Sequence, residues 1–243
     1  MGIGSIVLLA SLGWCPNGNP VGAAGKPANS QFLEFPNPFV EKVAGWTIEF
    51  DPEFRNSKNQ ILFKKTRKSL ANHLQRILFL LPSEKSKELK KLFIRVDVNH
   101  KLNNLQYHPS RTWLKQNGCD PRLEKRVHVP KARHLIEPGT WRKQPHVILH
   151  ELAHSYHHQV LGFENKEIID AYERTEKAGL YERVLLFNGE RTWHYARTNH
   201  KEFFAEMTEC YVGMNDFFPF VRAELLEYDP ETFLLMKKIW GQL

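Results

Sequence analysis

The sequence predicts an α+β fold with its helices concentrated in the C-terminal half. Two short segments with alternating apolar side chains, 45–50 and 92–98, are typical of strands. Several longer segments after residue 140 have apolar side chains at helical spacing. The chain has 243 residues, of which 42% are apolar and 25% charged. This suits one hydrophobic core and excludes a mostly disordered chain or a polytopic membrane protein.

The N-terminal residues have the outline of an export signal followed by a linker. Residues 3–12 are mostly apolar, and the small residues at 21–24 offer a cleavage site for a signal peptidase. We therefore predict a signal peptide at 1–24, a linker at 25–39, and a secreted or periplasmic protein. No Lys or Arg precedes Lys26, so the usual basic start is missing, and a disordered leader is the alternative.

The predicted domain covers residues 40–243, and its first half mixes helices and strands. Apolar residues recur at helical spacing over 59–81, so we expect an amphipathic helix that ends before Pro82. Its other face is basic and carries Lys64, Lys65, Arg67, Lys68 and Arg76. After it we expect a short polar helix at 83–91, the strand at 92–98, a loop at 99–126 and a short strand at 126–129.

The second half carries three predicted helices and one hairpin. The helices are expected at 141–161, 165–178 and 199–214, and the hairpin strands at 181–187 and 192–196. Gly162 and Gly179 follow the first two helices, where a glycine commonly ends a helix. Asn188-Gly189 suits a type I′ turn between the two strands.

Charge and cysteine content narrow the function classes. Lys and Arg number 34 and Asp and Glu 27, so the formal net charge is +7, but the excess is not gathered in one tract. A nucleic-acid partner, an acidic surface and simple solubility all remain open. Cys15, Cys119 and Cys210 form no CxxC motif, which excludes a disulfide framework and a Cys-rich zinc module. Whether Cys119 and Cys210 pair is also open.

The sequence His150-Glu151-Leu152-Ala153-His154 predicts a metal site on a helix. Residues four apart share one face, so the His150 and His154 imidazoles can converge on one zinc ion. Glu151 lies about 100° around the helix from His150 and can reach a water at the open ligand position without itself binding the metal.

A wider ladder of histidines leaves other interpretations open. His146, His150, His154 and His158 each lie four residues from the next, so a buffer-like metal site or a merely polar helix face is possible. Only the 150/154 pair has a glutamate directly after its first histidine, and this favours a catalytic site at that pair.

A catalytic zinc site needs a third protein ligand, and the helix predicted at 199–214 offers three carboxylates, Glu202, Glu206 and Glu209. Glu202 and Glu206 share a face, so one could bind zinc while the other accepts a hydrogen bond from a zinc-binding histidine. A capping box with Asn199 as N-cap is the competing interpretation of Glu202.

The segment from Tyr195 to Glu206, read with the upstream His-Glu-x-x-His helix, resembles the gluzincin peptidases related to the catalytic domain of anthrax lethal factor. The resemblance covers about residues 125–215. It implies a zincin-like domain with a small mixed sheet and zinc held by His150, His154 and Glu202. It further implies that Glu206 accepts a hydrogen bond from a zinc-binding histidine and that Tyr195 stabilises the oxyanion of the reaction.

We therefore predict a secreted zinc endopeptidase that acts on a protein or peptide substrate, with Glu151 and Tyr195 as catalytic residues. In related folds an extended substrate pairs with an edge strand beside the metal helix, and 127–129 is the candidate by position. We expect no nucleic-acid partner and no stable membrane span, because the apolar run at 3–12 is too short. The alternatives are a catalytically silent zinc-binding interaction module and a basic nucleic-acid binder using 58–91.

Overall fold

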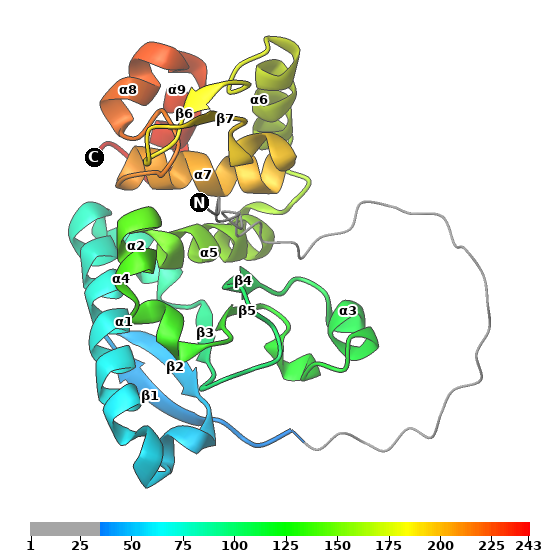
Figure 1. The fold of residues 1–243 in the computed structure, drawn as a ribbon. Coiled ribbons are helices and arrows are strands. Elements are labelled where there is room, and N and C mark those ends of the chain that lie inside the picture. The colour runs from blue at the N-terminus through cyan, green and yellow to red at the C-terminus, as the bar shows by residue number, and fades with distance from the viewer. Residues whose placement is uncertain (1–34) are drawn as a thin grey trace, which may run out of the picture.

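The computed structural model describes residues 35–243, which form two halves that meet where the helices α5 (Val147–Tyr156) and α7 (His200–Val212) pack together (Figure 1). A five-stranded sheet with helices on one side makes up the first half, and a group of helices with a small hairpin makes up the second. The predicted α+β class is confirmed. The predicted signal peptide and most of the predicted linker lie outside the described residues.

The sheet has the strand order β1-β2-β3-β5-β4. Its strands are β1 (Phe39–Val43), β2 (Trp46–Phe50), β3 (Phe93–Val96), β4 (Gln106–Tyr107) and β5 (Arg126–Val129). β2, β3 and β5 are parallel, and the two outer strands β1 and β4 run antiparallel to their neighbours. The strands predicted at 45–50, 92–98 and 126–129 are thus confirmed as β2, β3 and β5.

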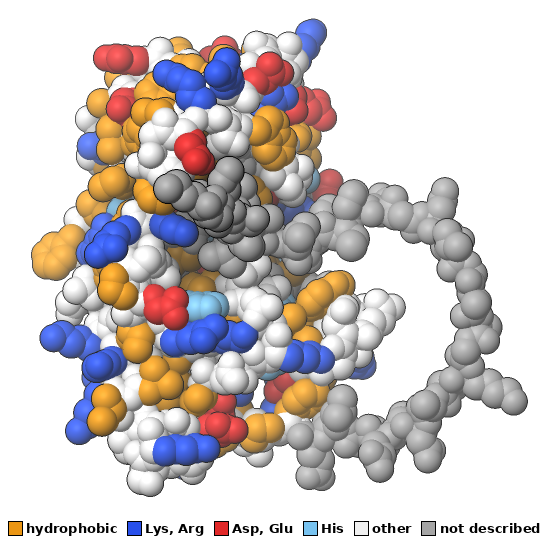
Figure 2. Space-filling view, viewed as in Figure 1, with side chains coloured by type: hydrophobic (Ala, Val, Ile, Leu, Met, Phe, Trp, Pro, Cys, Tyr) orange, Lys and Arg blue, Asp and Glu red, His pale blue; other side chains and the backbone are white. Residues whose placement is uncertain are grey.

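The amphipathic helix predicted at 59–81 is confirmed as α1 (Gln60–Leu80), and the short helix after it as α2 (Ser83–Leu89). Leu70, Leu74 and Ile77 of α1 are buried at helical spacing, whereas its lysines are exposed. Lys and Arg side chains therefore gather on the flank of the molecule that α1 forms (Figure 2).

The segment predicted as a loop at 99–126 contains β4 and a helix, α3 (Arg111–Gln116), so this prediction is wrong. Ser110 was the available signal, because its hydroxyl caps α3 by accepting from Trp113 N. β4 has only two residues and exists through its pairing with β5, which no sequence period reveals. The substrate strand proposed at 127–129 is also wrong, since β5 lies between β3 and β4 and the sheet edge beside the metal helix is β4.

The insertion that carries α3 and β4 is joined to the sheet by buried polar side chains. His128 of β5 contacts Asp97 through Nε2 and His108 through Nδ1, each at 3.0 Å. His128 is fully buried, and Asp97 also accepts from Arg95 at 2.6 Å. A buried polar network of this kind is stable only when its members are paired, and here it holds β4 in position on the edge.

The single helix predicted at 141–161 is divided in the structure. α4 (Pro138–Lys143) ends before Pro145, and α5 (Val147–Tyr156) begins after it. Pro145 lacks a backbone N–H and disfavours helical backbone at the residue before it, so the division was visible in the sequence. α5 continues into a π-helical turn, His157–Leu161, and ends at Gly162 with φ 82°, as predicted.

The second half packs α7 (His200–Val212) along α5 and surrounds it with three further helices (Figure 1). These are α6 (Lys166–Lys177), α8 (Arg222–Tyr228) and α9 (Pro230–Trp240). The helices predicted at 165–178 and 199–214 are thereby confirmed as α6 and α7. The buried Trp240 ring contacts Tyr156 of α5 and Phe204 of α7, which ties α9 to the helix pair.

The predicted hairpin is present but shorter, with β6 (Val184–Leu185) and β7 (Arg191–Thr192). Its turn is not type I′, because only Gly189 has positive φ. Asn188 instead accepts a hydrogen bond from Glu190 N, and Leu186 N donates to Glu190 O across a three-residue loop. Such a loop places its glycine in the left-handed region as a bulge.

Cys119 and Cys210 are both free and buried, and they belong to different apolar clusters, so they do not pair. Within residues 35–243, no helix combines the length and apolar character needed to cross a bilayer.

Candidate metal centre

The candidate site lies between α5 and α7, which run antiparallel along each other. Contacts between them occur in layers: His154 meets Glu202, His150 meets Glu206 and Glu209, and His146 meets Met214 just beyond the end of α7. As the residue number falls along α5 it rises along α7, which defines the antiparallel arrangement. His150 also reaches Glu202 through its Nε2, so Glu202 lies between the His150 and His154 rings.

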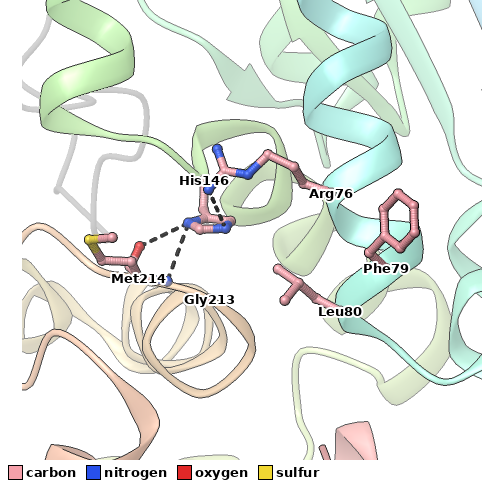
Figure 3. A pocket seen from close by; sticks show the side chains of 6 residues that line it. All are labelled: Arg76, Phe79, Leu80, His146, Gly213 and Met214. Atoms are coloured by element: carbon pink, nitrogen blue, oxygen red, sulfur yellow. Dashed lines mark hydrogen bonds between the residues drawn. The ribbon is translucent and has the colours of Figure 1, made fainter.

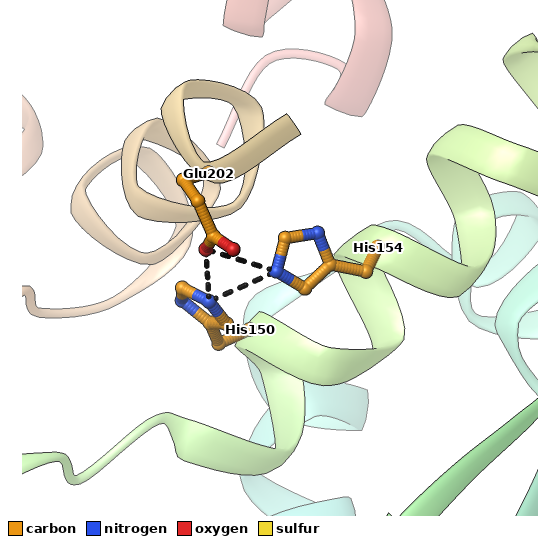
Figure 4. A group of neighbouring side chains, drawn as sticks. All are labelled: His150, His154 and Glu202. Carbon is orange, nitrogen blue, oxygen red and sulfur yellow. Dashed lines mark hydrogen bonds and ion pairs between the residues drawn. The ribbon is translucent and has the colours of Figure 1, made fainter. Parts of the chain in front are cut away.

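Three ligand atoms converge in the first layer (Figure 4). His150 Nε2 lies 3.1 Å from His154 Nε2 and 3.3 Å from Glu202 Oε2, and His154 Nε2 lies 3.2 Å from the same oxygen. A tetrahedral ion with bonds of about 2.0–2.1 Å places its ligand atoms about 3.3–3.4 Å apart. The triangle therefore has the size of one face of a zinc tetrahedron, and the fourth position is left to a non-protein ligand.

The second nitrogen of His150 faces a pair of carboxylates. Its Nδ1–H donates to Glu209 Oε1 at 2.7 Å, and Glu206 Oε1 lies 3.4 Å away. Both glutamates are buried, and Glu206 Oε2 accepts from Asn215 at 2.9 Å. The resemblance assigns to Glu206 the hydrogen bond from a zinc-binding histidine. In the structure, Glu209 makes the shorter contact with His150 Nδ1, and Glu206 lies beside it.

This arrangement leaves three acceptors pointing at one another. A proton on Nδ1 of neutral His150 leaves a lone pair on Nε2, which then faces the Glu202 carboxylate and His154 Nε2. Without a cation, one of the two histidine Nε2 atoms has to carry a proton that its neighbours accept. Burial alone lowers the pKa of His150, but hydrogen bonds to Glu202 and Glu209 raise it well above its ordinary value. A divalent cation can replace this proton.

Glu202 fulfils half of the predicted capping box. Asn199 caps α7 by accepting from Lys201 N and Glu202 N, as the capping interpretation requires. The Glu202 carboxylate, however, contacts the two histidines instead of returning to the backbone of the cap. The side chain is therefore available as a metal ligand.

Glu151, the predicted general base, is buried on the side of α5 that meets the sheet edge. A backbone hydrogen bond from Tyr107 of β4 reaches its carboxylate. Burial raises the pKa of Glu151, and the neighbouring His150 and His154 oppose that shift. A carboxylate with a raised pKa is better suited to accept and return a proton near neutral pH.

Tyr195 opens the 3-10 turn Tyr195–Thr198 that leads directly into α7, and it is half-buried against the core. The buried His194 precedes it and caps this turn, because its Nδ1 accepts a hydrogen bond from Ala196 N. The oxyanion role of Tyr195 remains a prediction.

The other two histidines of the ladder do not join the triangle. His146 contacts Arg76 of α1 and the backbone of Met214. His158 Nδ1 lies 2.7 Å from the hydroxyl of Tyr107. A metal site spread along all four histidines is therefore not formed, because their side chains diverge to different elements.

The sequence indicates Glu209 only as one of three candidate carboxylates, and it gives no indication that Tyr107 and Asn215 contact the site. Tyr107 lies in the segment taken as a loop, and Asn215 follows α7 without any helical signal of its own. Comparison with known proteins adds no assignment: no family model, curated protein or solved structure matches the chain.

Proposed function

We propose that the protein is a zinc-dependent endopeptidase whose metal ligands are His150, His154 and Glu202. One observation carries the proposal: three ligand atoms with mutual distances of 3.1–3.3 Å come from two helices, and a buried glutamate directly follows the first histidine. Three protein ligands with one position open are typical of catalytic zinc, whereas structural sites use four. The resemblance of the sequence to gluzincin peptidases supports this proposal, and we propose with it that the α+β fold is zincin-like.

A zinc ion bound here would supply a Lewis acid and a water of lowered pKa. Glu151 would take the proton from the attacking water and deliver it to the leaving nitrogen. Its hydrogen bond from β4 holds the carboxylate between α5 and the sheet edge. Glu209 would keep the His150 ring oriented, and Tyr195 would donate a hydrogen bond to the developing oxyanion.

An extended peptide would pair with β4, because β4 is the edge strand next to α5, whereas β5 lies inside the sheet. The substrate class we propose is accordingly a protein or peptide in an extended conformation. We also propose that the chain is exported, on the basis of residues 3–24 of the sequence.

The test compares the full chain with Glu151→Gln and Glu202→Ala on a mixed peptide library, with zinc content measured for each protein. We expect the wild type to cut, Glu151→Gln to bind zinc without cutting, and Glu202→Ala to lose tight zinc binding. Zinc binding without cleavage by the wild type would favour the catalytically silent module. Stoichiometric zinc and full activity in Glu202→Ala would remove Glu202 from the ligand set.

A further inference from the structure

A hollow lies at one end of the α5–α7 contact, away from the proposed metal ligands His150, His154 and Glu202. It has a volume of about 320 Å³ and is lined by Arg76, Phe79, Leu80, His146, Gly213 and Met214 (Figure 3). His146 lies one helical turn before His150, but its side chain contacts Arg76 and Met214 and not the three proposed metal ligands.

The rim of the hollow is apolar and exposed. Phe79 is 89% exposed, and Met214 and Leu80 are 47% and 37% exposed. Phe79 is more exposed than any other large apolar side chain within residues 35–243. Exposed apolar side chains that converge on one hollow are typical of an interaction site, whereas scattered ones carry no such meaning.

The wall of the hollow contains Arg76, a cation that forms no ion pair with any residue of 35–243. Arg76 donates from Nη1 to Pro145 O at 3.0 Å and from Nη2 to His146 Nε2 at 3.1 Å. Both acceptors are neutral, and no carboxylate of the described part of the chain pairs with Arg76. Burial lowers the pKa of Arg76, which is the direction expected for a partly desolvated cation without an anion. The guanidinium keeps further N–H groups for an anionic ligand.

The cation is held in place by a tightly fitted histidine. A Cβ added to Gly213 would lie 2.4 Å from His146 Nε2, so the ring occupies space that only glycine leaves open. Since Nε2 accepts from Arg76, His146 carries its proton on Nδ1 and donates it to Met214 O at 3.1 Å. The guanidinium is thus held against the two residues that precede α5 and, through His146, against Met214 just beyond α7.

A basic stripe leads along α1 to the hollow. Lys65, Lys68, Asn72, Arg76 and Phe79 follow one another at intervals of three and four residues, so they share one face of the helix. Lys65 and Lys68 are exposed, and among residues 35–243 neither pairs with a carboxylate. Arg67, on another face, pairs with Glu41 at 2.9 Å. The stripe and the hollow together present positive charge followed by an apolar recess.

We propose that this surface binds an extended acidic segment of a partner protein, with an apolar side chain of that segment in the hollow and its neighbouring carboxylate on Arg76. Charge complementarity selects the partner, because the stripe and the wall are cationic and form no ion pairs with the carboxylates of residues 35–243. Two of the three rim residues, Leu80 and Met214, are not aromatic, which favours an apolar side chain over a stacked base. The site is independent of the metal and of the proposed peptidase activity.

The test measures fluorescence anisotropy of labelled peptides with the full chain in the presence of a chelator, so that no zinc-dependent cleavage occurs. The probe is a short peptide with a central leucine flanked by aspartates. Its comparison peptides carry serine for the leucine or lysines for the aspartates. We expect the probe to bind and each comparison peptide to bind about tenfold more weakly, with affinity that falls as salt rises.

Two exposed substitutions, Phe79→Ser and Lys68→Glu, should each weaken the probe at least about fivefold without changing the melting temperature. Leu234→Ser and Lys177→Glu, on exposed positions of α9 and α6, are the matched controls and should leave binding unchanged. No probe binding, or equal loss in the Phe79 and Leu234 variants, would overturn the proposal. It is also overturned if a single-stranded oligonucleotide binds more tightly than the probe and Phe79→Ser leaves probe binding unchanged.

Discussion

Removing the carboxylate that holds His150 should weaken zinc binding without abolishing it. The perturbation is Glu209→Leu, which deletes the acceptor of the 2.7 Å hydrogen bond from His150 Nδ1. Both side chains are almost fully buried, so water does not replace the lost acceptor. Losing such a partner typically costs about 10–100-fold in metal affinity, which corresponds to about 1.4–2.7 kcal/mol.

The measurement is zinc competition against a chromogenic chelator at neutral pH. Glu209→Gln keeps an acceptor oxygen but loses the charge, and its affinity should lie between those of wild type and Glu209→Leu. Glu206→Gln is the matched control. Its Oε1 lies 3.4 Å from the same nitrogen and its Oε2 is already engaged by Asn215, so the change in affinity should stay below about threefold.

The result that would refute the reasoning is the reverse order, with Glu206→Gln losing affinity and Glu209→Leu retaining it. Melting of each metal-free variant separates a local effect from a loss of folding. If the wild type itself binds no zinc, the ligand assignment fails and the comparison of Glu206 with Glu209 does not arise.

Three further outcomes are expected. Burial, with Arg76 nearby, lowers the pKa of His73 from 6.5 to about 3, so its neutral form stabilises the fold above pH 6.5 and this contribution is lost as the pH falls toward 3. At pH 5 the loss is about 2 kcal/mol of unfolding free energy. Urea unfolding at pH 7 and pH 5 should therefore show a difference in stability between the two pH values that is about 2 kcal/mol smaller in His73→Leu than in the wild type. An equal difference in the two proteins would reject this role of His73. Gly213→Ala should destabilise the chain by about 1–3 kcal/mol through its clash with the His146 ring, whereas Gly139→Ala, where nothing lies within 4 Å, should stay within about 0.5 kcal/mol in thermal unfolding. Tyr195→Phe should keep zinc content and reduce turnover; a rate equal to wild type would reject the oxyanion role.

The elements that could be predicted from sequence are those with a long local pattern. α1 has a full apolar stripe, and α6 and α7 each begin at an asparagine cap. β4 and the division before α5 were missed for different reasons. β4 is too short to show a period, whereas Pro145 was a clear signal that the helical periodicity around it concealed.

Part of the proposed metal site can likewise be predicted from a local pattern, and part of it cannot. The sequence by itself determined that the His150 and His154 rings are neighbours with Glu151 beside them, because a spacing of four places two side chains on one face of a helix in any tertiary context. It also offered Glu202, Glu206 and Glu209 as candidates, without deciding among them.

Only the tertiary structure decided which carboxylate contacts which histidine nitrogen. Glu202, Glu206 and Glu209 lie on one side of α7, and the rotation and sliding of α7 on α5 determine which of them meets each nitrogen of His150. Tertiary packing also places the Tyr107 backbone of β4 within hydrogen-bonding distance of Glu151, and Arg76 of α1 next to His146. These contacts join segments far apart in the chain. Their geometry is determined by side-chain packing across the helix interface, which no local sequence pattern encodes.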